Sequence, residues 1–119
     1  MHNIKIKIQV TNGNDIAFGP GKAKLLEAIH EFGSIAAAAK SMGMSYKRAW
    51  DLVMVMNASF KEPLVSTIVG GSNGGGTTLT ITGQMVLRRY RAILDESEQF
   101  IAAEMSDFIS LLTQDTCPA

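Results

Sequence analysis

The fold is decided by residues 33–53, which read GSIAAAAKSMGMSYKRAWDLV. Ser34 precedes a short apolar run, and its hydroxyl can accept a hydrogen bond from a free N–H group of a helix that begins at the next residue. Four consecutive alanines form the body of that helix, which is predicted to end near Met42 and to allow close approach of another helix. Gly43 ends it, and Ser45 caps a second helix. The stretch therefore predicts two helices joined by a very short turn.

Small residues occur where these two helices would touch. Ala39 lies at the point of closest approach, and Gly43 follows four residues later in the turn. The second helix is predicted to end near Phe60. The positions expected to be buried between the helices are Ala38, Met42, Met44, Ala49 and Leu52. The segment from Ile35 to about Met54 therefore meets the steric requirements of a helix-turn-helix.

The first turn of the second helix is polar and basic. Its residues are Ser45, Tyr46, Lys47 and Arg48. In helix-turn-helix proteins that bind DNA this end of the helix enters the major groove, where lysine and arginine reach guanine O6 and N7 or a phosphate, and hydroxyls suit phosphate oxygens. These residues are candidates for DNA recognition, and the alternative is a structural helical hairpin with solvated basic residues. Trp50 is expected to be a packing residue rather than a stacking surface.

The N-terminal segment has a different periodicity. Ile4, Ile6, Ile8 and Val10 alternate with polar residues, which predicts a strand with one buried face. Residues 12–14 then predict a turn, and residues 16–18 a short second strand. Pro20 suits the first turn of a helix that extends to about Phe32 and ends at Gly33.

A glycine-rich segment separates two stretches rich in β-branched residues. Residues 64–69 and 77–82 predict the two strands of a hairpin around Gly70–Gly76. The glycine spacing invites comparison with a nucleotide-binding loop, but the lysine that would meet the phosphates is missing and a strand follows in place of a helix. After a helix-turn-helix, the hairpin is better explained as a wing whose backbone N–H groups approach DNA phosphates.

The C-terminal part predicts a long helix from about Gly83 to Leu112, about 45 Å in length. Its apolar positions recur every seven residues, which is typical of a coiled coil. The residues predicted to form a dimer contact are Leu87, Tyr90, Ile93, Leu94, Phe100, Ile101 and Phe108. An apolar stripe that extends beyond a small domain needs a partner chain. We therefore divide the chain into residues 1–82 and a dimerisation helix with a short tail, residues 83–119.

The formal charge of zero over 119 residues hides a strong segregation. Residues 1–94 carry +6, and residues 95–119 carry −6. The basic part is suited to a polyanion, while the alternative for the acidic part is a solvated helix face.

Other classes of function find little support. The single cysteine, Cys117, permits neither an intramolecular disulfide nor a multi-cysteine metal site. His2 and His30 lack neighbours at metal-ligand spacing, and the carboxylates of the last helix suggest a solvated face rather than an acid–base pair. We expect no enzyme activity, no metal and no cofactor. Without a long apolar run, no membrane contact is expected, and the protein is predicted to be cytoplasmic.

The motifs together resemble a known family. They comprise the stretch from Gly33 through the alanines, residues 43–51, Met56-Asn57, the glycine-rich hairpin tip and Leu79-Thr80. This set is similar to the N-terminal DNA-binding domain of ModE, the molybdate-responsive regulators, and more distantly to the DNA-binding domain of LysR-type regulators. The resemblance implies a winged helix-turn-helix that dimerises through its long C-terminal helix. It implies DNA contacts from the four residues of the recognition helix given above and from Gly71, Ser72, Asn73, Gly74, Gly75, Gly76, Thr77 and Thr78.

Two features depart from the family pattern. Family members follow this domain with small β-barrel domains that bind molybdate, whereas this sequence stops just after the long helix, so no molybdate site is expected in this chain. Asn73 stands where the family often places a lysine, which leaves backbone contacts to the wing.

Together these observations predict an α+β winged helix-turn-helix homodimer that acts as a sequence-specific transcriptional regulator, linked to molybdenum-related genes. Its two recognition helices would lie ~34 Å apart on a pseudo-palindromic site. Further phosphate contacts are predicted from Lys40, Arg88, Arg89 and Arg91. The alternative is a protein-interaction module in which the long helix binds a partner and the helix-turn-helix is a scaffold.

Overall fold

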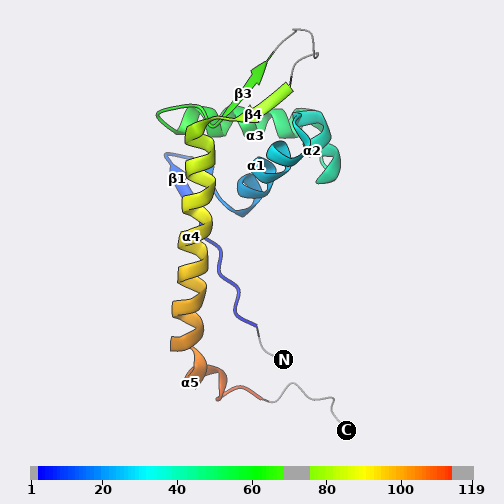
Figure 1. Ribbon diagram of the computed structural model, residues 1–119. Helices are drawn as coiled ribbons and strands as arrows, with labels where there is room; N and C mark the ends of the chain where they lie inside the picture. The colour runs from blue at the N-terminus through cyan, green and yellow to red at the C-terminus, as the bar shows by residue number, and fades with distance from the viewer. Residues whose placement is uncertain (1–2, 69–75, 114–119) are drawn as a thin grey trace.

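The computed structural model describes residues 3–68 and 76–113 (Figure 1). Within them the chain forms helices and two small antiparallel sheets, so the predicted α+β class is confirmed, in an arrangement compatible with a winged helix-turn-helix. The elements in chain order are β1 (Val10–Asn12), β2 (Asp15–Phe18), α1 (Pro20–Phe32), α2 (Ile35–Ser41), α3 (Tyr46–Ser59), β3 (Val65–Ile68), β4 (Gly76–Leu79), α4 (Ile81–Glu104) and α5 (Ser106–Ile109).

The predicted strand over residues 4–10 is wrong. Strand β1 begins only at Val10, because its partner β2 has four residues and the pairing ends at Val10 opposite Phe18. Residues 3–9 lie outside β1, although their side chains still alternate between exposed and half-buried. The segment is tied to α4 by the Tyr90 hydroxyl, which donates a hydrogen bond of 2.9 Å to the carbonyl of Ile8.

The helix boundaries around the helix-turn-helix agree closely with the prediction. Gly33 ends α1 with φ of 73°, and Gly43 lies between α2 and α3 with φ of 68°, a backbone conformation that favours glycine. The Ser34 hydroxyl accepts a hydrogen bond from Ala37 N–H at 3.0 Å, and the Ser45 hydroxyl accepts one from Arg48 N–H at 3.1 Å. Both predicted caps are therefore confirmed.

The core lies where α1, α2 and α3 meet the start of α4. Its largest fully buried side chains are Phe18, Leu25, Leu26, Ile29, Val53, Met56 and Leu64. Phe18 packs edge-on against Tyr90 of α4, with ring centroids 5.0 Å apart. Burial of this kind stabilises a domain by about 25 cal/mol per Å² of apolar surface removed from water. The contact joins β2 and α4, which lie far apart in the sequence.

The hairpin is shorter than predicted at its second strand. β4 ends at Leu79, and Ile81 and Thr82, predicted as strand, begin α4. The reason is Thr80, whose hydroxyl accepts a hydrogen bond from Gly83 N–H at 2.9 Å and so caps the helix. Of the first predicted strand, Val65–Ile68 is observed, while Val69 and the tip to Gly75 lie outside the described residues.

Asn57 fixes the hairpin to α3. Its side-chain oxygen accepts hydrogen bonds from Leu64 N–H at 2.8 Å and Val65 N–H at 3.1 Å, and its amide donates to the carbonyl of Val65 at 3.1 Å. On the other side, Thr77 N–H donates to the carbonyl of Gly33 at 2.9 Å. The base of the hairpin is thus held between α3 and the end of α1.

This anchoring leads to a first prediction, for Asn57→Ala. The substitution removes three hydrogen bonds and leaves backbone groups of a buried segment without partners, so the free energy of unfolding should fall by about 2 kcal/mol. Urea unfolding followed by circular dichroism measures this change. Asn14→Ala, at an exposed asparagine of the β1–β2 turn, is the control and should change stability by less than about 0.5 kcal/mol. Equal stabilities of the two variants would contradict the anchoring role.

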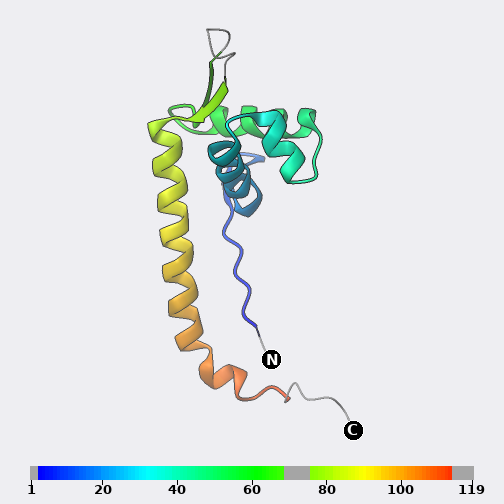
Figure 2. The same ribbon diagram turned by 45° about the vertical axis from the view of Figure 1, so that its right-hand side comes forward.

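The prediction of one helix continuing to Leu112 is wrong. Helix α4 ends at Glu104, a length of about 36 Å, and the chain turns at Met105 into the short α5. Ser106 donates a side-chain hydrogen bond back to the carbonyl of Ala103 at 3.2 Å, and such bonds compete with continued helix. Helix α4 nevertheless extends well beyond α1, α2, α3 and the two sheets (Figures 1 and 2).

Candidate nucleic-acid interface

The start of α3 forms an exposed polar and basic surface. Ser45, Tyr46, Lys47 and Arg48 are all exposed there. The helix is capped by Ser45, and its N-terminal end carries the positive pole of the helix dipole, which favours anions such as phosphate. The Lys47 ammonium lies 3.2 Å from the Asp51 carboxylate, in an ion pair whose side chains are 84% and 59% exposed. So exposed a pair is worth little, and Lys47 can exchange it for another anion.

Helix α2 supports α3 as predicted. Ala38 and Ala49 are fully buried between the two helices, while Met42, Met44 and Leu52 are half-buried against the same core. Lys40, in the last turn of α2, is exposed. The helix-turn-helix packing expected from the small residues is therefore present.

The hairpin projects from the same end of the molecule as α3 (Figure 2). Gly71, Ser72, Asn73, Gly74 and Gly75, predicted to contact DNA, lie outside the described residues. Gly76 is half-buried in β4, and Thr77 is only 6% exposed, so its side chain is structural rather than a surface contact. Among the described residues of the predicted set, Thr78 alone presents an exposed side chain from the hairpin.

The structure differs from the expectation that Trp50 is a packing residue rather than a stacking surface. Its side chain is 38% exposed, and its ring stacks on that of Tyr46, with centroids 6.3 Å apart and 14° between the ring planes. The buried face of α3 is formed by Ala49, Val53 and Met56, and Trp50 lies about 100° around the helix from Ala49. The spacing of four residues between Tyr46 and Trp50, which puts both on one flank, was the signal in the sequence.

The predicted dimerisation residues fall into two groups. Tyr90 is 8% exposed and lies in the core of its own chain, where burial raises the pKa of its hydroxyl. Leu87 and Leu94 are half-buried against the same core. Ile93 and Phe100 are 52% and 66% exposed on α4. Ile101 is half-buried, and Phe108, exposed, belongs to α5 rather than to the predicted continuous stripe.

An apolar pocket of about 440 Å³ lies beside the exposed part of α4. Its lining residues are Val10, Phe18, Phe60, Met85, Val86, Arg89, Tyr90 and Ile93. Ile93 belongs both to the pocket lining and to the exposed apolar residues of α4, and Phe100 lies seven residues further along the same helix.

The three predicted arginine contacts on α4 are not equivalent. Arg91 forms an ion pair with Glu27 of α1. Arg88 and Arg89 are exposed, and Arg89 borders the apolar pocket. Arg91 therefore joins α4 to α1 within the chain.

Neither a metal centre nor a membrane span is found in the part of the chain that the structure describes. His30 lies exposed near the end of α1, and no group of three or more histidine, cysteine, aspartate or glutamate side chains over residues 3–68 and 76–113 could hold a metal ion.

The fold and the exposed end of α3 are compatible with the helix-turn-helix class of DNA-binding domains. The chain is 47% identical over 77 residues to the molybdenum transport protein ModE of Azotobacter vinelandii, which is 65% of this chain and 28% of that protein. It is 38% identical over 90 residues to the transcriptional regulator ModE of Haemophilus influenzae, which is 76% of this chain and 35% of that protein. It is 41% identical over 97 residues to the molybdenum-pterin-binding protein MopB of Rhodobacter capsulatus, which is 82% of this chain and 34% of that protein.

The resemblance to ModE regulators is therefore confirmed. The chain spans about a third of the length of the curated relatives it matches. No family model matches the chain.

Proposed function

We propose that this chain is a sequence-specific DNA-binding transcriptional regulator acting on molybdenum-related genes. The observation that carries the proposal is the exposed, basic N-terminal turn of α3, which lies at the same end of the molecule as the β3–β4 hairpin. The names of relatives such as the Haemophilus influenzae transcriptional regulator ModE support the same class.

In this proposal α3 enters the major groove. Its 14 residues span about 21 Å, and the basic residues of its first turn, Lys47 and Arg48, are exposed. A lysine or arginine in this position contacts a guanine edge or a phosphate. The stacked Tyr46–Trp50 pair adds a rigid apolar flank that suits thymine methyl groups or sugars.

The hairpin acts as the wing. Its base is held by Asn57 and by the carbonyl of Gly33, so Thr78 has a fixed position relative to α3. Backbone N–H groups of the tip and the Thr78 hydroxyl contact phosphates, which positions the domain on the duplex without carrying sequence information.

A homodimer formed through α4 places two such units on a pseudo-palindromic operator. The support for this step is the apolar side chains of α4: Ile93 and Phe100 are more than half exposed, and Ile93 lines the pocket of about 440 Å³. A two-fold axis along α4 relates the two recognition helices, which must lie ~34 Å apart to occupy successive major grooves.

The test starts from random duplex DNA. The protein selects a pool, and fluorescence anisotropy then measures affinity for the enriched sequence at several salt concentrations. A palindromic consensus bound with a steep salt dependence is expected, because phosphate contacts release counterions. Negligible, salt-insensitive affinity would contradict the proposal and would favour the protein-interaction module, in which α4 binds a partner.

Lys47→Ala and Arg48→Ala are the matching variants. Each is expected to cost ~1 to 3 kcal/mol of binding free energy if the side chain contacts a base. Lys24→Ala, which removes the same charge from an exposed position of α1, is the control and should bind as the unmodified protein does. Unchanged affinity in both variants would remove α3 as the recognition helix.

A further inference from the structure

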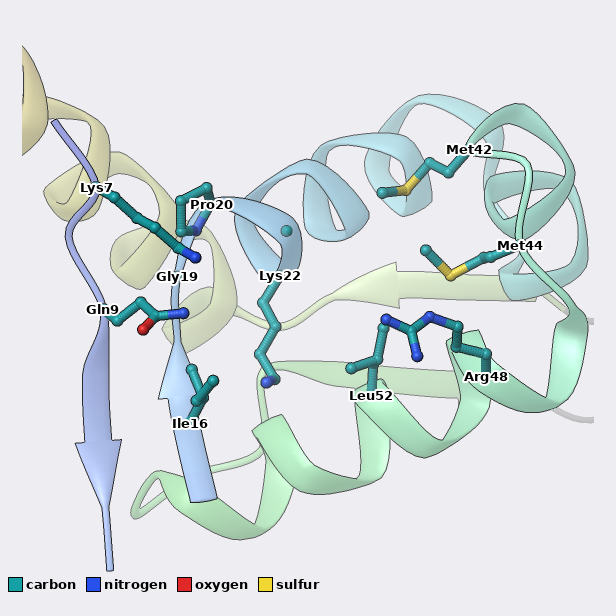
Figure 3. A pocket seen from close by; sticks show the side chains of 11 residues that line it. Lys7, Gln9, Ile16, Gly19, Pro20, Lys22, Met42, Met44, Arg48 and Leu52 are labelled. Carbon is teal, nitrogen blue, oxygen red and sulfur yellow. The ribbon is translucent and has the colours of Figure 1, made fainter. Parts of the chain in front are cut away.

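A second cavity, of about 380 Å³, lies on the flank of α3 that faces the start of α1 (Figure 3). Its walls come from the N-terminal segment, β2, the first turn of α1, the α2–α3 turn and α3 itself. Its lining residues are Lys7, Gln9, Ile16, Gly19, Pro20, Gly21, Lys22, Met42, Met44, Arg48 and Leu52. Three of these described lining residues are cationic, and none carries a carboxylate.

Lys22 is the unusual member of this set. Its residue is only 9% exposed, yet among residues 3–68 and 76–113 its ammonium has neither a hydrogen-bond nor an ion-pair partner. Figure 3 shows the side chain running from α1 toward Leu52 and Ile16. Burial lowers the pKa of Lys22, the charge of Asp15 opposes this shift and that of Arg48 adds to it. The Lys22 nitrogen is not itself fully buried, because no buried side-chain nitrogen or oxygen of the described residues lacks a partner. Since no lining residue carries a carboxylate, the ammonium is open to an anion that enters the cavity.

The start of α1 supplies further donors to the same cavity. Gly19 is the N-cap residue and has no side chain with which to cap, and Pro20 follows. The first intrahelical hydrogen bond runs from Ala23 N–H to the carbonyl of Gly19 at 2.9 Å, which leaves the N–H groups of Gly21 and Lys22 for a ligand. Apart from Gly21 itself, its chain neighbours and the backbone of α1, no heavy atom of the described residues lies within 4 Å of the position that a Cβ would take at Gly21, so this position is open to a ligand.

Apart from Gln9, the remaining side chains of the lining are apolar. Ile16, Leu52 and the side chains of Met42 and Met44 line the cavity beside the cations. Methionine side chains adapt to irregular apolar shapes. A bare inorganic ion would leave these walls unused, whereas a small organic molecule with one anionic group would meet both kinds of surface.

We propose that this cavity binds a small phosphate monoester, with its dianionic group against Lys22, Arg48 and the N-terminal end of α1 and its organic part against Ile16, Leu52 and the two methionines. The site is separate from the dimerisation surface of α4. The proposal rests on the DNA-binding function only where it gives Arg48 a role in both the cavity and the DNA contact.

Arg48 belongs to both sites. It lines the cavity, and it also lies in the first turn of α3 that is proposed to contact DNA. A ligand that holds the guanidinium in the cavity withdraws it from the duplex, so the two binding events are coupled and each weakens the other. The cavity is thus an effector site for the helix-turn-helix.

The direct test titrates phenyl phosphate into the isotopically labelled protein and follows the backbone amides by NMR. Saturable shifts of the Gly21 and Lys22 amides are expected, with a dissociation constant of about 1 mM or tighter. Phenol, which lacks the charge, and inorganic phosphate, which lacks the ring, should each bind at least about 10-fold more weakly. Absence of saturable shifts at these amides would overturn the proposal.

Two variants sharpen this test. Lys22→Met keeps a side chain of similar length and should weaken phenyl phosphate binding about 10-fold or more, because a charge-assisted hydrogen bond is lost. Its amide spectrum and melting temperature, compared with those of the unmodified protein, test whether it remains folded. Lys24→Met, two residues along α1 and exposed, should bind as the unmodified protein does. Equal binding by both variants would overturn the assignment of Lys22.

A third experiment, with DNA, distinguishes two ligands for the cavity: a small phosphate monoester and the phosphate groups of DNA. Saturating phenyl phosphate should weaken DNA binding by the unmodified protein several-fold and leave the Lys22→Met variant unaffected. If the amide signals of Gly21 and Lys22 shift with DNA but not with phenyl phosphate, the proposal is overturned, and these amides instead contact the phosphate backbone of DNA. If DNA fails to bind at all while phenyl phosphate still does, the DNA-binding function fails and the anion site stands.

Discussion

Gly83→Ala is expected to destabilise the fold by about 3 kcal/mol or more, enough to lower the melting temperature by at least about 10 °C. A Cβ at this position in the first turn of α4 would overlap the backbone carbonyl of Leu64. Contact of this kind with backbone atoms cannot be relieved by turning a side chain aside. The whole start of α4 would have to move away from the segment before β3.

The surrounding hydrogen bonds oppose that movement. The carbonyl of Leu64 accepts a bond from Thr80 N–H at 2.9 Å, and the N–H of Leu64 donates to Asn57. The Thr80 hydroxyl also donates to the carbonyl of Pro63 at 2.7 Å. Because Leu64 is fully buried as well, neither side of the contact can shift without breaking several interactions.

Thermal and urea unfolding at equal protein concentration measure the effect. Gly21→Ala is the matched control, since in the described structure a Cβ there meets open space and alanine is the better helix former. This control should be neutral or more stable by up to about 1 kcal/mol. If the Gly83→Ala and Gly21→Ala proteins had the same melting temperature, α4 would not pack on Leu64 as described.

Phe100→Glu is expected to convert a dimer into a monomer and to weaken operator binding by about 10² to 10⁴, the range by which linkage of two binding units raises affinity. Phe100 is 66% exposed on the part of α4 that extends beyond the core. A carboxylate there would be buried and unpaired in a dimer contact, whereas it costs little in a monomer.

The choice of residue follows from the burial of its neighbours. Leu94 lies half-buried against the core of its own chain, so a charge at that position would also damage the fold. Ala102 lies on the opposite side of α4 from Phe100 and Ile93, and Ala102→Glu adds the same charge as a control. Light scattering gives the mass of each variant. A monomeric mass for the unmodified protein, or a dimer that tolerates Phe100→Glu and not Ala102→Glu, would contradict this dimer contact.

The helix ends around the helix-turn-helix were predictable from local sequence. Gly33 and Gly43 adopt positive φ, and Ser34 and Ser45 cap the helices that follow them. Each of these signals involves residues no more than four positions apart. Their physical basis, a free N–H group or a left-handed backbone, is therefore complete within the segment itself.

Other features of the site depended on distant parts of the chain. Thr77 is buried because β4 packs on the end of α1, and Tyr90 because α4 packs on Phe18. The alternating residues 4–10 have strand periodicity, but β2 is too short to pair with most of them. Trp50 is exposed because the buried stripe of α3 passes through Ala49 instead.

The cavity around Lys22 is the clearest example of a feature that depends on tertiary packing rather than on local sequence. Its three cations are Lys7 of the N-terminal segment, Lys22 of α1 and Arg48 of α3, which have no common spacing in the sequence. Local hydrogen bonds specified the starts of α2 and α3, and the basic character of the first turn of α3 was evident from the sequence itself. The tertiary structure alone decided which side chains are buried and which remain accessible to a ligand. The reason is that accessible surface depends on packing between residues far apart along the chain, and not on any one segment.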